Sequence, residues 1–255
     1  MTIHQDWDKT EVTHLTGLNM PKMAWFTADS VRGITPMPLS KRIFDITFAI
    51  VLLIPVLLLM LLIAGALLLV QGRPIIYSAR RMSGLNQSFT LWKFRTMSVE
   101  QSDYGVTGAH KNGRITPFGH FLRRTRIDEL PQLFNILRGD MSFVGPRPPN
   151  REHVEQFPTV YAQVLKSRPG VTGMATLIYH QHEGKILSAC TSPEATETVY
   201  RRRCLPAKLR LDLIYQRHRS ILMDLWIMWQ TVRIVTVGID RRKGRARRPK
   251  IGVQG

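Results

Sequence analysis

The chain has 255 residues, enough for one sizeable domain or for one domain with additional segments. Its 36 Lys+Arg outnumber 18 Asp+Glu, which gives a formal net charge of +18. That charge indicates an anionic partner, such as nucleic acid, phospholipid headgroups or a phosphorylated small molecule. The spacing of the two cysteines, Cys190 and Cys204, fits neither a zinc site nor a disulfide framework. We therefore expect reduced, structural thiols in a cytosolic soluble part.

The N-terminal quarter of the chain changes abruptly from polar to apolar. Residues 1–40 are moderately polar, lack a clear periodicity and are interpreted as an N-terminal extension. The next segment, 41–72, contains the run "ITFAIVLLIPVLLLMLLIAGALLLV" (46–70), which has no charged residue. A run of this length predicts a membrane segment rather than a buried helix of a soluble protein.

Two membrane geometries are consistent with this segment. Lys41 and Arg42 precede it and Arg73 follows it, and basic residues prefer the cytoplasmic side at both ends. Pro55 interrupts the apolar run and can bend or break a helix there. A helix–break–helix that returns to the same face and a single span kinked at Pro55 both fit these residues.

The rest of the chain, residues 73–238, predicts a mostly helical α+β domain. The stretch "PIIYSARRMSGLNQSFTLWKFRTM" favours a short β-hairpin that turns at 83–86. "HFLRRTR" and "DELPQLFNILRG" predict helices, the second beginning at Asp128 and ending at Gly139. The prolines of "FVGPRPPN" predict a rigid non-helical loop, and "PEATETVYRRRCLPAKLRLDLIYQRHRS" predicts broken helices.

The C-terminal region combines an apolar stripe with a basic tail. In "ILMDLWIMWQTVRIV" the stripe at helical spacing consists of Leu222, Leu225, Trp226, Trp229 and Val232. A helix at the membrane–water interface and a helix packed on the domain core both explain such a stripe. The basic tail, 239–255, contains an arm at 241–250 that we expect to be disordered and to bind anionic lipid. Nucleic acid is the generic alternative ligand for such an arm.

Asp128 and Glu129 form an acidic pair inside a strongly basic stretch, with Arg123 one helical turn upstream. In a structural interpretation, Asp128 caps a helix and Glu129 is favoured by the positive helix N-terminus. In a functional interpretation, a carboxylate kept ionised by arginines attacks a phosphorus atom or holds Mg²⁺. Spacing alone leaves both interpretations open.

Basic residues elsewhere in the sequence support the functional interpretation. Arg147 lies between Pro146 and Pro148, which fix its backbone and suit it to bidentate contact with phosphate. Lys93 and Arg95 alternate on a predicted strand, so we expect them to share one face. Together with the acidic pair and the adjacent membrane segment, these residues predict a site for a membrane-borne phosphate.

Four segments carry a resemblance to a known family. "KRIFDITFAIVLLIPVLLL", "LWKFRTM", "RRTRIDELPQLFNILRGDMSFVGPRP" and "RPGVTG" closely resemble the bacterial sugar transferases, the monotopic polyprenyl-phosphate phosphoglycosyl transferases. The resemblance runs from about Ser40 to Val235. It implies a re-entrant helix–break–helix at Pro55, a short β-hairpin and amphipathic interfacial helices around a small cytosolic catalytic domain. It also implies a location on the cytoplasmic face of the bacterial inner membrane.

The resemblance implies an Mg²⁺-dependent enzyme that transfers a sugar-1-phosphate from a UDP-sugar to undecaprenyl phosphate and releases UMP. This reaction would be the first step of exopolysaccharide or other surface glycan assembly, with no nucleic-acid partner. Asp128 matches the nucleophile that forms a phosphosugar-aspartyl intermediate, and Glu129 matches the residue that supports it through Mg²⁺ or proton handling. Arg123 and Arg147 match phosphate-contacting positions, and Arg81 matches a family position in the hairpin.

The sequence departs from the family pattern at several positions. Ile54 stands where a serine often precedes the kinking proline, and Ala79 replaces the usual glutamine of the hairpin. The stretch "MATLIYHQHEG" differs from the usual sequence after "RPGVTG", so we expect it to influence the choice of sugar. Its His180 and His182, beside Glu183, are expected to be surface histidines, with a zinc site as the alternative.

Two other functions compete with the transferase. A membrane-tethered basic protein that binds nucleic acid or lipid without catalysis explains the net charge. It gives no reason for the arrangement of Asp128, Glu129 and Arg147. An enzyme with the same site could instead release sugar phosphate to water, provided that water reaches the intermediate.

Overall fold

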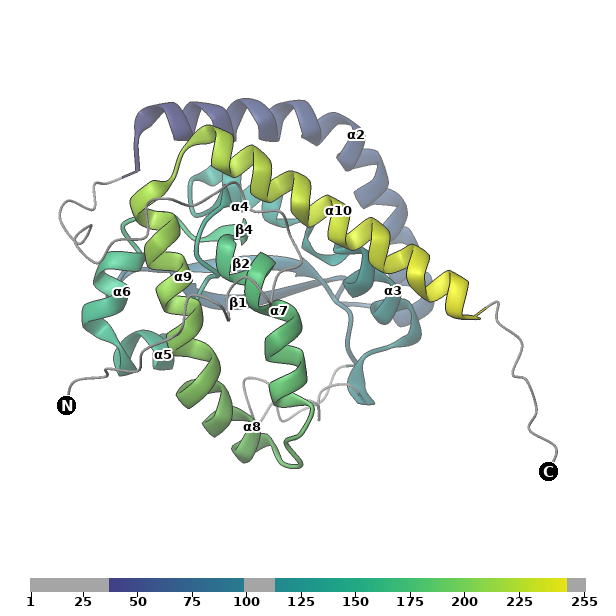
Figure 1. Ribbon diagram of the computed structural model, residues 1–255. Helices are drawn as coiled ribbons and strands as arrows, with labels where there is room; N and C mark the ends of the chain where they lie inside the picture. The colour runs from purple at the N-terminus through teal and green to yellow at the C-terminus, as the bar shows by residue number, and fades with distance from the viewer. Residues whose placement is uncertain (1–36, 99–112, 247–255) are drawn as a thin grey trace.

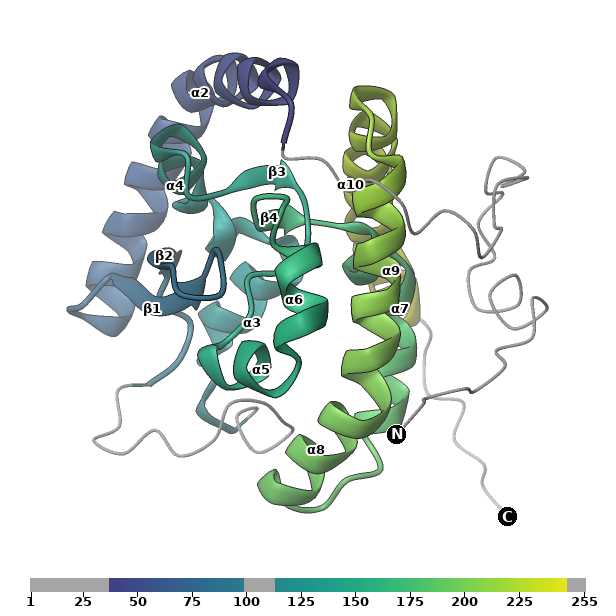
Figure 2. The same cartoon turned by 90° about the vertical axis from the view of Figure 1, so that its left-hand side faces the viewer.

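The computed structural model describes residues 37–98 and 113–246, with side chains described as far as 236. Two small sheets lie between the long helix α2 on one side and α7, α9 and α10 on the other (Figure 2). The prediction of a mostly helical domain with a short β-hairpin is confirmed. The helices that surround the sheets are α2 (Leu39–Gln71), α3 (Pro117–Thr125), η2 (Ile127–Glu129), α4 (Gln132–Arg138), α5 (Arg151–Gln156), α6 (Pro158–Val164), α7 (Met174–Leu187), α8 (Pro193–Val199), η3 (Tyr200–Cys204), α9 (Leu205–His218) and α10 (Ile221–Ala246).

Helix α2 is the apolar segment, and by length and composition it could cross a membrane. Its 33 residues correspond to about 50 Å of helix. The helix continues through Pro55 and bends along its length (Figure 1), so the expected break is not present. A proline removes only one hydrogen bond of the helix, and both flanking halves are supported by packing on the domain. The outward side of α2 exposes large apolar residues, including Ile54, Leu58 and Leu69.

Both ends of α2 are attached to the same folded domain. Near its N-terminus, Arg42 donates hydrogen bonds to the carbonyl oxygens of Ile136 and Leu137, at 2.6 and 2.8 Å. At its C-terminus, Arg95 donates to the backbone carbonyls of residues 71–73. Because the last carbonyls of a helix have no intrahelical partner, Arg95 completes the end of α2.

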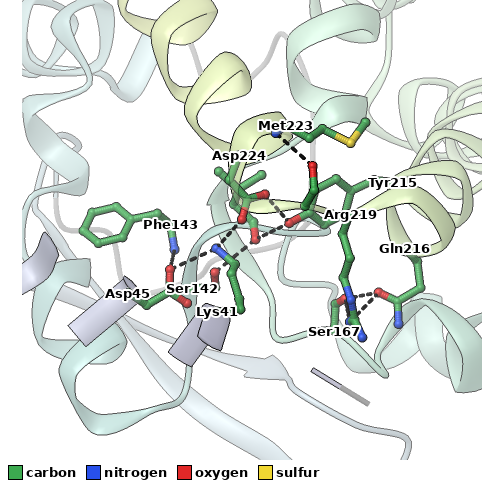
Figure 3. Close-up of polar contacts among 12 residues, drawn as sticks. Lys41, Asp45, Ser142, Phe143, Ser167, Tyr215, Gln216, Arg219, Met223 and Asp224 are labelled. Atoms are coloured by element: carbon green, nitrogen blue, oxygen red, sulfur yellow. Dashed lines mark hydrogen bonds and ion pairs between the residues drawn. The ribbon is translucent and has the colours of Figure 1, made fainter. Parts of the chain in front are cut away.

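A buried charge cluster fixes the start of α2 to α10. The Nζ atom of Lys41 lies 2.9 Å from Oδ1 of Asp45 and 2.8 Å from Oδ2 of Asp224 (Figure 3). The hydroxyl of Tyr215 lies 2.7 Å from the other oxygen of Asp224. These four side chains, here called the Lys41 cluster, are almost inaccessible to solvent. Removing one partner from a buried ion pair costs about 3–5 kcal/mol, so the cluster holds α2 firmly on the domain.

The predicted hairpin is formed by β1 (Ile76–Met82) and β2 (Ser88–Phe94), which pair antiparallel. Ser83 donates its backbone N–H to the carbonyl of Gln87 and closes the expected turn. Alternation along β2 places Phe89 and Leu91 in the core beneath α2. The same alternation places Lys93, two residues beyond Leu91, toward the site described below.

A second sheet, which was not predicted, pairs β3 (Ser142–Val144) with β4 (Gly170–Thr172) in parallel. Strands of three residues are too short to show an alternating pattern in the sequence. The backbone N–H of Gly145 continues this pairing with a bond to the carbonyl of Thr172 at 3.0 Å. A Cβ atom on Gly145 would lie 2.3 Å from the carbonyl oxygen of Arg168, so only glycine allows this close approach.

The broken helices predicted near the C-terminus are confirmed as α8, the π-helical segment η3 and α9. Helix α10 follows and buries Ile227 in the core. Its predicted apolar stripe faces mostly outward, with exposed Leu222, Leu225, Trp229 and Val232. Core packing therefore explains α10 as a helix but leaves most of this stripe uncovered.

The predicted disordered arm at 241–250 is wrong for its first part, because α10 continues to Ala246. Arginine, lysine and alanine are good helix formers, and α10 is already nucleated by its packed N-terminal turns. The expected boundary before residue 239 consequently falls inside a helix. Residues 247–255 of the tail and 1–36 of the extension lie outside the described residues.

Candidate active site

A cavity of about 830 Å³ opens between the hairpin, η2, the Pro-Arg-Pro loop and the helices α7 and α9. It brings together side chains from segments far apart in the sequence. Among the predicted site residues, its lining includes Arg81, Lys93, Arg95, Arg123, Asp128, Glu129, Arg147 and Pro148. Pro146 is buried beneath the loop and does not line the cavity. The predicted acidic pair and the predicted basic residues thus share one space.

A sharp turn between α3 and α4 positions the acidic pair, Asp128 and Glu129. Helix α3 ends at Thr125, and Arg126 adopts a left-handed conformation with φ of 61°. The chain then forms the single 3₁₀ turn η2, which carries both carboxylates. A non-glycine residue in this conformation is unfavourable and is often associated with functional sites.

The structural interpretation of Asp128 as a helix cap is wrong. Helix α4 begins at Gln132, with Pro131 at its N-cap position and no side-chain hydrogen bond there. The proline ends the preceding turn, so the predicted start at Asp128 is four residues too early. The predicted end at Gly139 is confirmed, with a left-handed φ of 92°.

Asp128 is 6% exposed, and its Oδ1 atom accepts no hydrogen bond from any described residue. Burial, together with the adjacent negative charge of Glu129, raises the pKa of Asp128 to about 6. Lys93, Arg123 and Arg126 oppose this change. The carboxylate is therefore ionised near pH 7 but is poorly neutralised, which leaves it available to a ligand or an electrophile.

Glu129 has the opposite environment. Its Oε1 lies 2.6 Å from Nζ of Lys93, and its Oε2 lies 3.0 Å from a guanidinium nitrogen of Arg126. Burial by itself would raise the pKa of Glu129, but these two cations outweigh burial and lower it to about 2. Two adjacent carboxylates with pKa values pushed apart are typical of groups with different roles in one reaction.

The other cations surround the acidic pair on different elements. Arg123, on α3, donates from Nε to Oγ1 of Thr96 at 2.7 Å, and its charge acts on Asp128. Arg81, on β1, is bonded to Oδ1 of Asn150. Both arginines are fixed by neutral partners, so their positive charge remains available to an anion in the cavity.

The Pro-Arg-Pro loop is held rigidly on two sides. Gly170 donates its N–H to the carbonyl of Pro146 at 2.8 Å, and Met82 donates to the carbonyl of Pro149 at 3.0 Å. Arg147 projects from this frame as an exposed side chain. Its charge acts on Glu129 and lowers the pKa of Lys93, whose largest cause of lowering is burial. Arg147 therefore lies near the acidic pair without being neutralised by it.

Arg95 differs from Lys93, with which it was expected to share a face. Strand β2 ends at Phe94, so Arg95 leaves the alternation of the strand. Its two terminal nitrogens bond the carbonyls at the end of α2, as described above, although the side chain also lines the cavity. The structure consequently gives Arg95 an anchoring contact beside the predicted phosphate site.

The donor set for a metal ion is small. Among the described residues, no group of three or more His, Cys, Asp and Glu side chains is arranged to hold a metal ion. His180, His182 and Glu183 on α7 therefore do not form the zinc site that was considered as an alternative. Mg²⁺ needs less, because it commonly binds one or two carboxylates together with substrate phosphates and water. The unpartnered Oδ1 of Asp128 fits this requirement. Both oxygens of Glu129 are already occupied by cations.

Several cavity residues were missed by the sequence interpretation. Arg126 could have been noticed from its position next to the acidic pair. His153, Tyr200, Lys208 and Asp212 come from α5, η3 and α9 and carry no local motif. Only the packing of these helices shows that they line the same cavity.

Comparison with known proteins agrees with this geometry. The family model described as "Bacterial sugar transferase" matches residues 37–238. A UDP-glucose:undecaprenyl-phosphate glucose-1-phosphate transferase from Klebsiella pneumoniae is 36% identical over 196 residues, covering 75% of this chain and 39% of the relative. A UDP-N-acetylgalactosamine-undecaprenyl-phosphate N-acetylgalactosaminephosphotransferase from Aeromonas hydrophila is 31% identical over 208 residues, covering 79% and 45%.

A shorter relative is matched over most of its length. The exopolysaccharide production protein ExoY from Sinorhizobium fredii is 33% identical over 227 residues, covering 82% of this chain and 91% of the relative. By contrast, the chain spans about two fifths of the length of the Klebsiella relative. The residues matched by the family model, 37–238, include the acidic pair, the Pro-Arg-Pro loop and the apolar helix. The chain belongs to the bacterial sugar transferase family.

Proposed function

We propose that this protein transfers a sugar-1-phosphate from a UDP-sugar to undecaprenyl phosphate and releases UMP. The observation that carries the proposal is the unpartnered Oδ1 of Asp128, which lies in a large cavity among fixed cations. The names of the Klebsiella and Aeromonas relatives describe this type of transfer for glucose and N-acetylgalactosamine. The name of the Sinorhizobium relative supports a role in exopolysaccharide production.

In the first half-reaction, an oxygen of Asp128 attacks the phosphorus atom that bears the sugar. The bond between this phosphorus and the bridging oxygen breaks, and UMP leaves with the bonding electrons. The product is an acyl phosphate, in which the Asp128 carboxylate and the phosphosugar are joined as a mixed anhydride. Arg123 and Arg147 stabilise the charge that develops on the phosphoryl oxygens, and Glu129 holds Lys93 and Arg126 in place.

In the second half-reaction, a phosphate oxygen of undecaprenyl phosphate attacks the same phosphorus atom. This attack forms the lipid diphosphate sugar and restores the Asp128 carboxylate, so no net proton is consumed. A covalent intermediate allows a soluble donor and a lipid acceptor to use one site in turn. Mg²⁺, which we propose as the cofactor, would neutralise charge on the donor diphosphate beside Asp128.

The proposed membrane arrangement follows from the attachments of α2. Both ends of this helix bind the same domain, so we infer that α2 enters the bilayer and returns to the cytoplasmic face of the inner membrane. The single kinked span would separate the two ends by the thickness of the bilayer. The exposed stripe of α10 and the basic tail would contact the headgroups of anionic lipids. Such contacts would place the cavity near the lipid phosphate.

The test is UMP release from a panel of UDP-sugars by the full chain in nanodiscs with undecaprenyl phosphate and Mg²⁺. We expect release that requires Mg²⁺ and is abolished in Asp128→Asn, with labelled sugar recovered in the lipid. Glu155→Gln, which removes an exposed carboxylate on α5, is the matched control and should retain activity.

The alternative functions give different results in this assay. A non-catalytic binding protein would give no difference between wild type and Asp128→Asn. A hydrolase would release UMP and free sugar phosphate without any lipid acceptor. Either result would overturn the transferase proposal.

A further inference from the structure

The cavity continues beyond the acidic pair into a second group of side chains, here called the distal arm. It consists of Tyr161 on α6, Glu183 on α7, Tyr200 on η3, and Lys208 and Asp212 on α9. We propose that the distal arm binds the hexose ring of the nucleotide-sugar donor and determines which sugar is accepted. This inference rests on the proposed function and names the sugar-recognition residues of that site.

The distal arm is a preorganised group that is separate from the acidic pair. The Nζ atom of Lys208 lies 2.9 Å from Oε2 of Glu183 and 3.4 Å from the hydroxyl of Tyr200. The charges with the largest effects on Asp128 are those of Glu129 and its neighbouring cations, whereas Lys208 acts on Asp212. The two groups therefore form two ends of one cavity.

Asp212 provides an unused hydrogen-bonding group at this end. The residue is 6% exposed and lines the cavity, yet its Oδ1 accepts no hydrogen bond from any described residue. Burial raises the pKa of Asp212 to about 8, against the opposing effect of Lys208. Near neutral pH the carboxyl group can therefore both donate and accept, which suits a sugar hydroxyl better than a phosphate.

The composition of the distal arm also suits a sugar ring. Tyr161 and Tyr200 contribute buried aromatic rings, while Glu183, Lys208 and Asp212 contribute a few polar atoms that could fix an orientation. Tyr200 begins a π-helical segment, and such segments are rare and often occur at functional sites.

The position of the distal arm favours the sugar over the uridine. Helix α2 lies along one side of the molecule, whereas α8 and the first turns of α9 lie at the opposite side (Figures 1 and 2). The sugar must stay bound in the covalent intermediate while UMP leaves and the lipid arrives from the side of α2. A nearly closed arm away from α2 meets that requirement. His180 lies between the two groups, because its pKa is affected by the charges of Arg126 and Arg147 as well as by those of Glu183 and Lys208.

The test measures binding of UMP, UDP-glucose, UDP-galactose, UDP-GlcNAc and UDP-GalNAc by calorimetry. The full chain is used in nanodiscs as the Asp128→Asn variant, so that the UDP-sugars bind without being turned over. We expect Asp212→Leu to weaken the binding of the tightest-binding UDP-sugar by about 10- to 100-fold. The differences in affinity among the UDP-sugars should also become smaller, because a lost hydroxyl contact removes discrimination. The affinity for UMP should stay within about twofold of its original value, since UMP lacks the sugar.

Two further variants make the result specific. Asp212→Asn keeps a hydrogen-bond donor and a hydrogen-bond acceptor, so it should retain most of the differences in affinity among the UDP-sugars. Gln216→Leu removes a buried polar side chain one turn further along α9, outside the cavity lining, and should lower stability without changing donor ranking. Equal weakening of all donors and of UMP by Asp212→Leu would assign the arm to uridine and overturn the proposal, as would no change at all. Absence of turnover in the wild type would instead refute the proposed function.

Discussion

Two carboxylate pairs in the described part of the chain, Asp45 with Asp224 and Asp128 with Glu129, are organised in opposite ways. In the Lys41 cluster, one lysine lies between two aspartates and pairs with both, although Oδ2 of Asp45 accepts no hydrogen bond from any described residue. In the acidic pair, Lys93 and Arg126 both bind Glu129, and Asp128 is left with an unpartnered oxygen. The first arrangement is closed and joins α2 to α10. The second opens onto a large cavity. The difference shows that neither burial nor an unpartnered oxygen alone indicates a site; an unpartnered carboxylate oxygen beside an accessible cavity does.

The largest expected effect is the loss of activity in Asp128→Asn, by about 10³-fold or more, because the nucleophile is removed. The same variant should be more stable than wild type. The folded-state pKa of Asp128 is about 6, above its ordinary value of 3.8, so its ionised form is unfavourable above that pH. Removing the charge should therefore raise the free energy of unfolding by up to about 3 kcal/mol.

This gain would be measured by denaturant unfolding at pH 7.5 in EDTA. Glu129→Gln is the paired variant. It should lower the free energy of unfolding by about 2–3 kcal/mol, because the fold stabilises the ionised carboxylate of Glu129. That stabilisation is present above the ordinary pKa of 4.5 and is lost as the pH falls toward about 2. Destabilisation by both variants would contradict the contrast between the two carboxylates.

The Lys41 cluster should respond in the opposite direction from Asp128. Lys41→Met leaves two buried carboxylates without their cation and should lower the free energy of unfolding by about 3–5 kcal/mol. Lys41→Arg keeps the charge and should lose less. The measurement is denaturant unfolding at neutral pH in the same nanodiscs. A loss below about 1 kcal/mol, typical of exposed pairs, would show that the cluster is not the anchor of α2.

A smaller effect is expected from the frame of the Pro-Arg-Pro loop. In Gly145→Ala, the new methyl group would meet the carbonyl of Arg168, so the loop that carries Arg147 must shift. We expect a loss of about 1–3 kcal/mol in stability and a fall of about 10- to 100-fold in kcat/KM, because misplaced charges stabilise the transition state poorly. Gly184→Ala on α7, where the methyl group meets nothing, should leave kcat/KM nearly unchanged and raise stability by up to about 1 kcal/mol, because alanine is the better helix former. Equal results for the two variants would refute the role of the loop frame.

The smallest expected effect is a shift in the pH profile. Lys93 lowers the pKa of Asp128, so Lys93→Met should raise it above about 6. Because the nucleophile must be deprotonated, the acidic limb of kcat/KM should move to higher pH by up to about one unit at constant Mg²⁺. The profile is measured from pH 5 to 8. A shift to lower pH would show that Lys93 does not act on Asp128.

Much of this organisation could be predicted from local sequence. The hairpin, α3, the end of α4 at Gly139 and the apolar segment follow from alternation, turn residues and hydrophobicity. The family motifs also identified the acidic pair and most of the basic residues that line the cavity. These features depend on residues close together in the chain.

The remaining features depend on packing between distant segments. The sequence predicted that Arg95 contacts phosphate. In the structure its guanidinium instead donates hydrogen bonds to three backbone carbonyls at the end of α2. Asp128 was predicted as a possible helix cap, but in the structure it lies in a 3₁₀ turn that ends before α4 begins. The distal arm combines residues of four helical segments, and no spacing in the sequence could have joined Tyr161 to Asp212.

The central claim is that Asp128 becomes covalently bound to the phosphosugar. It is tested most directly by mixing the protein in nanodiscs with UDP-sugar and Mg²⁺, without lipid acceptor, and mapping peptides by mass spectrometry after rapid quenching. We predict a burst of UMP stoichiometric with the protein and a phosphosugar adduct on Asp128 that disappears when undecaprenyl phosphate is added. UMP formation that requires the lipid from the start, with no adduct at any time, would contradict it.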